Sequence, residues 1–213
     1  MRKATPKKRS ATSLTKSEMI VNAARKLFLE DGFGPTSMDA IANHAGVSKP
    51  TLYSHFQNKE GLFSEVMIMM CNEAGGPIMI EEIFASTRPP KLVLKQAAHF
   101  LLNRALHPTG IALFRTVLAE APKFPELGKV FWETGPQRFT EGLGQYLASL
   151  KRASQVRISD PLGAAEQFRA MIVGTYVLPA LVGVAPALSE KERDRRLTHT
   201  VSAFLKILGH KQR

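Results

Sequence analysis

Hydrophobic residues recur every three or four positions along most of the chain, the spacing that places them on one side of an α-helix. In the first such segment, Ile20, Ala23, Ala24, Leu27 and Phe28 form this stripe. The alternation of period two that is typical of strands is scarce. The pattern therefore predicts an all-α protein of about nine helices, at residues 16–31, 37–45, 49–55, 59–73, 91–106, 109–120, 126–152, 161–184 and 190–208.

Capping residues stand at the starts of several of these helices. Thr15 and Glu18 are spaced as a capping box, in which the hydroxyl and the carboxylate each accept from a free backbone N–H. Comparable caps precede other helices, at Thr36 with Asp39, at Ser48, and at Ser189 with Glu192. These local signals predict where the helices begin.

The second and third predicted helices are short and are joined by a turn at Gly46 and Val47. Two such helices, braced by another, are the plan of a helix-turn-helix. In the third helix we expect Leu52 and Phe56 to face inward, while the outer side carries Lys49, Thr51, Tyr53 and His55. A short helix with a polar outer side fits the major groove of DNA, which is about 12 Å wide. The pattern thus predicts a DNA-reading element near the N-terminus.

The net charge of +11 and the pI of about 10.0 favour a polyanionic partner. Much of this charge lies in residues 1–16, which hold six basic side chains and no acid, and we expect a disordered arm at 1–15. Such an arm is either a solvated tail or a segment that reaches phosphates or a minor groove. Residues 17–60 carry four basic and five acidic side chains, so net charge says little about that segment.

Cys71 is the single cysteine, which excludes an internal disulfide and suits a reducing cytoplasm, where we expect the protein to work. Residues 170–188 carry no formal charge over a length that could cross a bilayer, but Pro179 and Pro186 would break such a span. We expect a helix buried in a core or between subunits, and no membrane insertion.

Signatures of catalysis and cofactor binding are missing from the sequence. The six histidines show no metal-ligand spacing, and there is no nucleophile elbow, Walker loop or dinucleotide fingerprint. We therefore expect no enzyme, no metal site and no cofactor.

The run from Thr36 to Phe63, TSMDAIANHAGVSKPTLYSHFQNKEGLF, resembles the signature of the TetR family of bacterial repressors. The resemblance is dense over residues 16–65. The run from Ala119 to Leu127, AEAPKFPEL, resembles regulators with an AcrR- or AefR-like C-terminal domain. The resemblance implies a transcription regulator with a helix-turn-helix domain at 16–62 and an effector-binding and dimerisation domain at 63–213.

The resemblance implies that Ser48, Lys49, Pro50 and Thr51 begin the recognition helix and that Tyr53 and His55 touch the DNA backbone. Lysine can donate to guanine in the major groove, so we assign Lys49 to a base. We assign to phosphates the set Thr36 or Ser37, Tyr53, His55 and Lys59. For Ser48 and Thr36, an equal alternative is that they only cap helices and do not contact DNA. Tyr53 has the alternative of an aromatic residue that packs at the rim of the domain.

One recognition helix makes few base contacts, so we expect a homodimer on a palindromic operator. The helices at 161–184 and 190–208 are the candidates for its interface, through Val173, Val177, Leu197, Val201, Phe204 and Leu205.

The resemblance also implies a cavity for a small lipophilic effector. Its candidate lining is aromatic or sulfur-containing: Phe100, Phe114, Trp132, Phe139, Tyr146, Phe168, Met171 and Tyr176. Aromatic and Met residues at helical spacing are usually plain core, and that is the alternative for each of these residues. The alternative function is a DNA-binding regulator or architectural protein that needs no effector.

Overall fold

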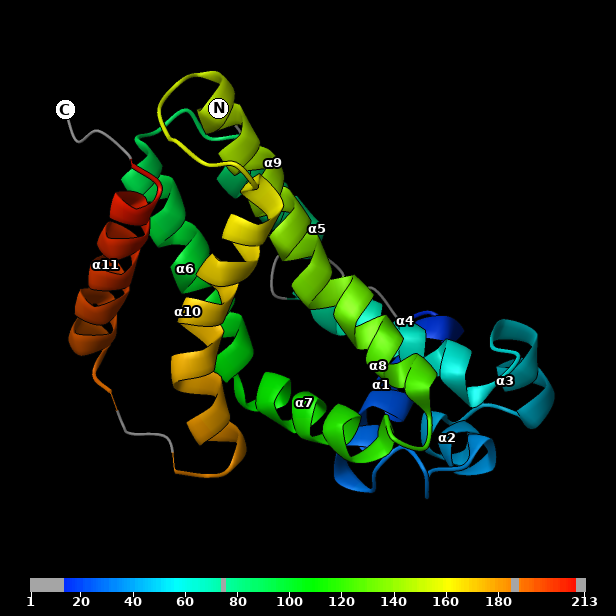
Figure 1. Cartoon of the computed structure of the whole chain (residues 1–213). Coiled ribbons are helices and arrows are strands. Elements are labelled where there is room, and N and C mark those ends of the chain that lie inside the picture. The colour runs from blue at the N-terminus through cyan, green and yellow to red at the C-terminus, as the bar shows by residue number, and fades with distance from the viewer. Residues whose placement is uncertain (1–13, 74–75, 185–187, 210–213) are drawn as a thin grey trace, which may run out of the picture.

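The computed structural model describes residues 14–73, 76–184 and 188–209, so that nearly all of the basic arm and the break at Pro186 lie outside the described residues. Every regular element within them is helical (Figure 1). In chain order they are α1 Lys16–Glu30, α2 Met38–Ala45, α3 Lys49–His55, α4 Lys59–Glu73, α5 Gly76–Phe84, α6 Pro90–Leu106, α7 Pro108–Glu120, α8 Pro125–Trp132, the π-helical segment η1 Glu133–Gln137, α9 Arg138–Arg152, α10 Pro161–Leu181 and α11 Glu190–Ile207. The all-α prediction is confirmed.

The helices of the N-terminal part enclose one hydrophobic core. Its centre is a triangle of rings, in which Phe28, Phe33 and Phe63 lie with centroids 5.2–5.7 Å apart. Side chains of α7 and α8, including Val117 and Leu127, complete the same core. The helices α2 and α3, which are expected to read DNA, therefore rest on a base that the C-terminal part helps to build.

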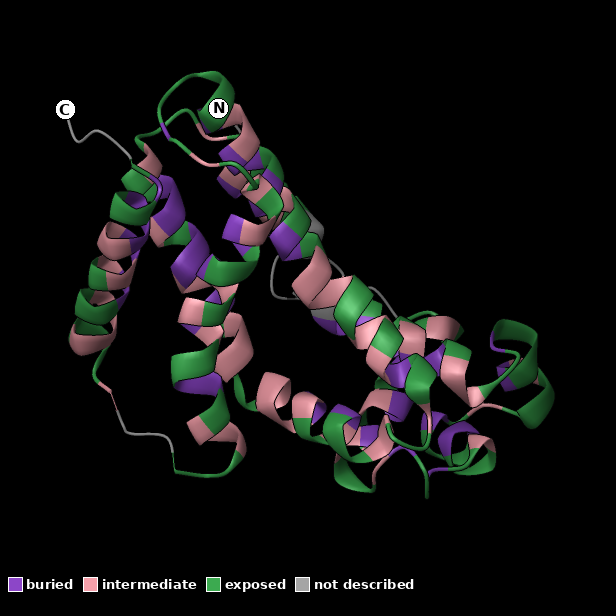
Figure 2. Ribbon diagram, viewed as in Figure 1, coloured by how far each residue is buried: buried purple, intermediate pink, exposed green. Residues whose placement is uncertain are grey.

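A second, larger core joins α6, α9, α10 and α11. Figure 1 shows α6, α10 and α11 side by side, while α8, η1 and α9 form a long rod that runs from this bundle to the N-terminal helices. Figure 2 shows the buried residues on the inner sides of these helices. None of the described helices is both long enough and apolar enough to span a membrane.

Three boundaries differ from the sequence-based expectation. The Gly76-Pro77 pair begins α5 in the stretch between 73 and 91 where no helix was expected, because proline is tolerated in the first helical turn. The helix expected at 126–152 contains the π-helical segment, with Pro136 inside it. These two differences account for eleven α-helices in the described residues where about nine were expected.

The third difference concerns α2, whose N-cap is Ser37 and not Thr36. The Ser37 hydroxyl accepts from the backbone N–H of Ala40 at 3.1 Å. Thr36 is 4% exposed, and its hydroxyl donates to the carbonyl of Gly32 at 2.7 Å. Thr36 thus holds the end of α1 to the start of α2 from inside.

Candidate nucleic-acid interface

The turn between α2 and α3 depends on a left-handed residue. Gly46 has φ +67°, and its N–H donates to the carbonyls of Ala42 and Asn43. A residue with a Cβ is strained in this conformation, whereas glycine is not. Ser48 then caps α3, because its hydroxyl accepts from the N–H of Thr51 at 3.3 Å. The turn therefore sets the angle at which α3 leaves α2.

The helix α3 presents a polar side to solvent and an apolar side to the core. Leu52 is fully buried and Phe56 is 8% exposed, so both anchor the helix from below. Tyr53 is 49% exposed, and Lys49 and His55 are also exposed. The structure therefore has the inner and outer side chains of α3 that the sequence predicts.

Lys49 forms an ion pair across the two helices. Its ammonium lies 2.5 Å from Oδ2 of Asp39, and both side chains are more than half exposed. Surface pairs of this kind contribute little to stability, so the lysine can exchange this partner for another acceptor. The pair holds Lys49 at the N-terminal end of α3 without burying it.

Two of the residues assigned to phosphates make contacts within the protein. The Thr36 side chain is buried, which removes it from the surface. The Lys59 ammonium donates to the carbonyls of Phe33, Gly34 and Thr36 at 2.7, 3.0 and 2.9 Å. It also lies 4.4 Å from the centroid of the Phe33 ring, and burial lowers its pKa. Through these contacts Lys59 ties the α1–α2 loop to the start of α4, and its assignment to a phosphate stays a prediction.

The corner between α7 and α8 docks against this same loop. The rings of Phe124 and Phe33 meet edge to face with centroids 5.0 Å apart. The Glu120 carboxylate lies so close to Gly34 that a Cβ there would come within 3.1 Å of Oε2. From the sequence, Glu120 and Phe124 could be placed only in the run that resembles AcrR- or AefR-like regulators. Local sequence does not reveal which distant segment a loop contacts.

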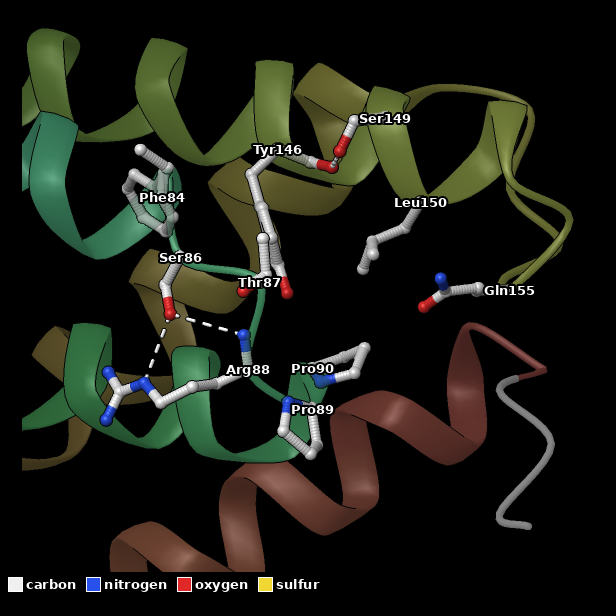
Figure 3. A pocket seen from close by; sticks show the side chains of 11 residues that line it. Phe84, Ser86, Thr87, Arg88, Pro89, Pro90, Tyr146, Ser149, Leu150 and Gln155 are labelled. Atoms are coloured by element: carbon white, nitrogen blue, oxygen red, sulfur yellow. Dashed lines mark hydrogen bonds between the residues drawn. The ribbon is translucent and has the colours of Figure 1, made fainter.

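The structure does not gather the candidate effector residues around one cavity. Phe139, Tyr146, Phe168 and Tyr176 are buried in the larger core. The others are spread over several helices: Phe100 and Met171 pack at the edge of that core, Phe114 stacks on Phe131 with centroids 5.1 Å apart, and Trp132 is 45% exposed beneath the Arg169 guanidinium. Of the eight, Tyr146 is among the described residues that line the cavity of Figure 3.

Most of the candidate dimer residues pack inside their own chain. Leu197, Val201, Phe204 and Leu205 are at most 1% exposed and belong to the larger core. Their stripe faces α6 and α10, which leaves them no surface to offer a second chain. Val177 is 3% exposed, and Val173 is partly buried against the same core. This corrects the expectation that the apolar stripe of the last helix forms the interface.

Two family models match the chain and together cover most of it. The model described as "Bacterial regulatory proteins, tetR family" matches residues 20–66. The model described as "AefR-like transcriptional repressor, C-terminal domain" matches residues 92–209, more than half of the chain. The two matches divide the chain into an N-terminal part that carries α2 and α3 and a helical C-terminal part.

Individual relatives agree with these models. The HTH-type transcriptional regulator YhgD of Bacillus subtilis is 39% identical over 61 residues, which are 29% of this chain and 32% of that protein. The chain thus spans about a third of the length of this curated relative.

Solved structures match over nearly the whole chain. A TetR-family regulator from Mesorhizobium loti is 28% identical with a TM-score of 0.78, over 94% of this chain and 98% of that one. The flavonoid-responsive regulator FrrA is 33% identical with a TM-score of 0.75, over 90% of this chain and 96% of that one. The chain belongs to the TetR family of DNA-binding transcriptional regulators, with an AefR-like C-terminal domain.

Proposed function

We propose that this regulator represses transcription by binding a palindromic operator as a homodimer, and that a small lipophilic effector releases it. The observation that carries this proposal is the outer side of α3, where polar side chains are exposed above the buried Leu52 and Phe56. The matching C-terminal family model, described for a repressor, supports the sign of the regulation.

In the proposed complex, α3 lies in the major groove. Lys49 leaves Asp39 and donates to a guanine, while Tyr53, His55 and the α2 N-terminus at Ser37 contact phosphates. Ser48, Pro50 and Thr51 keep the first turn of α3 in shape, since the Ser48 hydroxyl is already used as a cap. Thr36 and Lys59 support this surface from inside the protein.

The outer face of α10 is the surface we propose for the dimer. Ala170, Gly174 and Leu178 follow one another every fourth residue and are all exposed, Leu178 by 64%. Small residues let a second helix approach closely, and the exposed leucine supplies apolar area.

A Leu178→Glu variant is expected to be monomeric in analytical ultracentrifugation and to lose operator affinity. The matched Leu92→Glu variant, at a leucine of α6 that is 48% exposed, is expected to stay dimeric.

The effector class is inferred from a relative that covers almost the whole chain. FrrA is described as flavonoid-responsive, and it is 33% identical over 90% of this chain. We therefore propose an aromatic effector. Such a ligand lowers operator affinity if it binds more tightly to the conformation in which the two α3 helices no longer fit successive turns of the major groove.

The test begins with selection of bound fragments from the source genome at a stated salt concentration, followed by binding titrations on the recovered site. Lys49→Ala is expected to cost about 1–3 kcal/mol of affinity and to relax the preference at one base pair. The control is Lys129→Ala, since the Lys129 side chain is also more than half exposed and paired with one carboxylate, that of Glu133, but lies on α8. Equal losses for both variants would contradict the assignment of α3. If no aromatic compound changes the affinity for the operator, the result would instead support a regulator that needs no effector.

A further inference from the structure

A cavity of about 440 Å³ lies where the loop between α5 and α6 faces the C-terminal turns of α9 (Figure 3). The loop contributes residues 84–90, and α9 contributes Tyr146, Ser149 and Leu150, with Gln155 at one end. This volume falls within the range of about 300–1,000 Å³ that is usual for small-molecule sites. The cavity is therefore large enough for a compound of a few rings.

Tyr146 brings a hydrogen-bond donor to this cavity. Its ring stacks on Phe84 with centroids 5.6 Å apart, which fixes the direction of the side chain. Figure 3 shows the Tyr146 side chain reaching from α9 towards the loop that carries Thr87, and both residues line the cavity. Burial raises the pKa of Tyr146 to about 12, so the hydroxyl keeps its proton at neutral pH and donates.

The remaining walls present more polar than apolar surface, which suits a ligand that carries several oxygen atoms. Pro89, Pro90 and Leu150 supply apolar surface, and Thr87 adds a second hydroxyl. No aspartate or glutamate is among the described lining residues. Arg88 stands at the rim, where its Nε donates to Ser86 Oγ at 3.1 Å, so positive charge is present and held in place. An aromatic compound with a carbonyl or phenolate oxygen matches this set of groups.

The cavity is joined to the N-terminal core by two helical elements. Tyr146 and Phe124 lie near opposite ends of the rod formed by α8, η1 and α9, roughly 33 Å apart at 1.5 Å per residue. Phe124 contacts Phe33 at the α1–α2 loop. On the other side of the cavity, Phe84 ends α5, which packs against α4 as well as α9. A ligand between the α5–α6 loop and α9 therefore acts on both elements that reach the N-terminal core.

We propose that this cavity is the effector site, and that it takes a hydroxylated aromatic ketone whose carbonyl or phenolate oxygen accepts a hydrogen bond from Tyr146. The inference rests on the proposed function, since it names the place and the chemistry of the effector. This lining takes the place of the eight effector residues expected from the sequence, and Tyr146 is the member of that set that it includes.

Calorimetric titration of the full-length protein with the flavanone naringenin tests the site directly. Tyr146→Phe keeps the ring stacked on Phe84 and removes the donor, so binding is expected to weaken about 5–10-fold. Thr87→Trp fills the cavity from an exposed loop position and is expected to abolish measurable binding. Tyr176→Phe is the matched control, because Tyr176 lies in the larger core outside the cavity, and it is expected to bind as the unchanged protein does.

A second measurement separates this inference from the proposed function. Fluorescence anisotropy on the recovered operator shows whether naringenin releases the protein, and release is expected to weaken in step with binding in both cavity variants. Release that depends on Tyr176 and not on Tyr146 or Thr87 overturns the site and leaves the effector mechanism standing. No binding of naringenin by a protein that binds its operator overturns the ligand class. A protein that binds no genomic fragment at all contradicts the proposed function instead.

Discussion

The rings of Phe124 and Phe33 meet edge to face, with centroids 5.0 Å apart and planes inclined by 71°. Phe33 belongs to the α1–α2 loop, whereas Phe124 precedes α8. The Lys59 ammonium lies between these segments, 4.4 Å from the Phe33 centroid and 5.9 Å from that of Phe124. We name Phe33, Lys59, Glu120 and Phe124 the joint, because they connect the DNA-reading helices to the rod that ends at the cavity.

Phe124→Leu is expected to weaken the response to effector more than operator binding itself. The change removes an aromatic pair that contributes about 0.5–1.5 kcal/mol while keeping an apolar side chain. Operator affinity and its decrease at saturating effector are measured by anisotropy. Phe131→Leu is the control, since it breaks the stacked pair with Phe114 and leaves the joint intact. If both variants reduce the effector response equally, the joint does not transmit it.

Lys59→Met distinguishes a structural lysine from a phosphate contact. The change leaves the carbonyls of Phe33, Gly34 and Thr36 without their donor, which is expected to cost about 1–3 kcal/mol of unfolding free energy. Denaturant unfolding measures this loss. The slope of log affinity against log salt is expected to stay the same, whereas loss of a phosphate contact would lower it by about 0.9. A reduced slope with unchanged stability would instead show that Lys59 contacts a phosphate of the DNA.

The outcome for these residues shows which features the sequence could predict. The starts of helices were predictable because caps are local: Thr15 and Glu18 form the expected reciprocal box. The inward side of α3 was predictable because Leu52 and Phe56 are four residues apart. The periodicity of α11 identified Val201 and Phe204 as buried, but a stripe does not reveal whether it is covered by its own chain or by a partner.

Contacts between distant segments were beyond a single sequence. The joint combines residues more than 80 positions apart, and Tyr146 meets the α5–α6 loop across a shorter but still long gap in the chain. The exchange of roles between Thr36 and Ser37 was also hidden, because two adjacent hydroxyls satisfy the same capping pattern. Only the fold decides which of them turns inward.

The carboxylate of Asp194 is expected to make stability depend on acidic pH. Hydrogen bonds from Lys95 and then His99 of α6 hold the pKa of Asp194 below its ordinary value of 3.8. Because the folded-state pKa is lower than the unfolded one, the contribution is present above pH 3.8 and disappears as the pH falls through the folded-state value.

Thermal unfolding of the Asp194→Asn variant checks this expectation. Its melting temperature is expected to lie below that of the unchanged protein at pH 7, with the difference closing as the pH falls below 3.8. Added salt is expected to shrink the difference at pH 7, because the group is exposed. A difference that is independent of pH would assign the effect to something other than the charge of Asp194.

Gly142→Ala is expected to disturb the cavity while leaving operator binding intact. A Cβ at this position of α9 would lie 3.0 Å from Ile80 Cγ2 and 3.3 Å from Phe84 Cδ2, so α5 must shift. Phe84 stacks on Tyr146, and its movement changes the wall of the cavity. The gain of up to about 1 kcal/mol from replacing a helical glycine offsets part of the strain. The measurable result is weaker naringenin binding at nearly unchanged stability. Gly135→Ala is the control, because a Cβ there meets no atom within 4 Å, and a similar loss of binding in both variants would contradict the role of the α5–α9 contact.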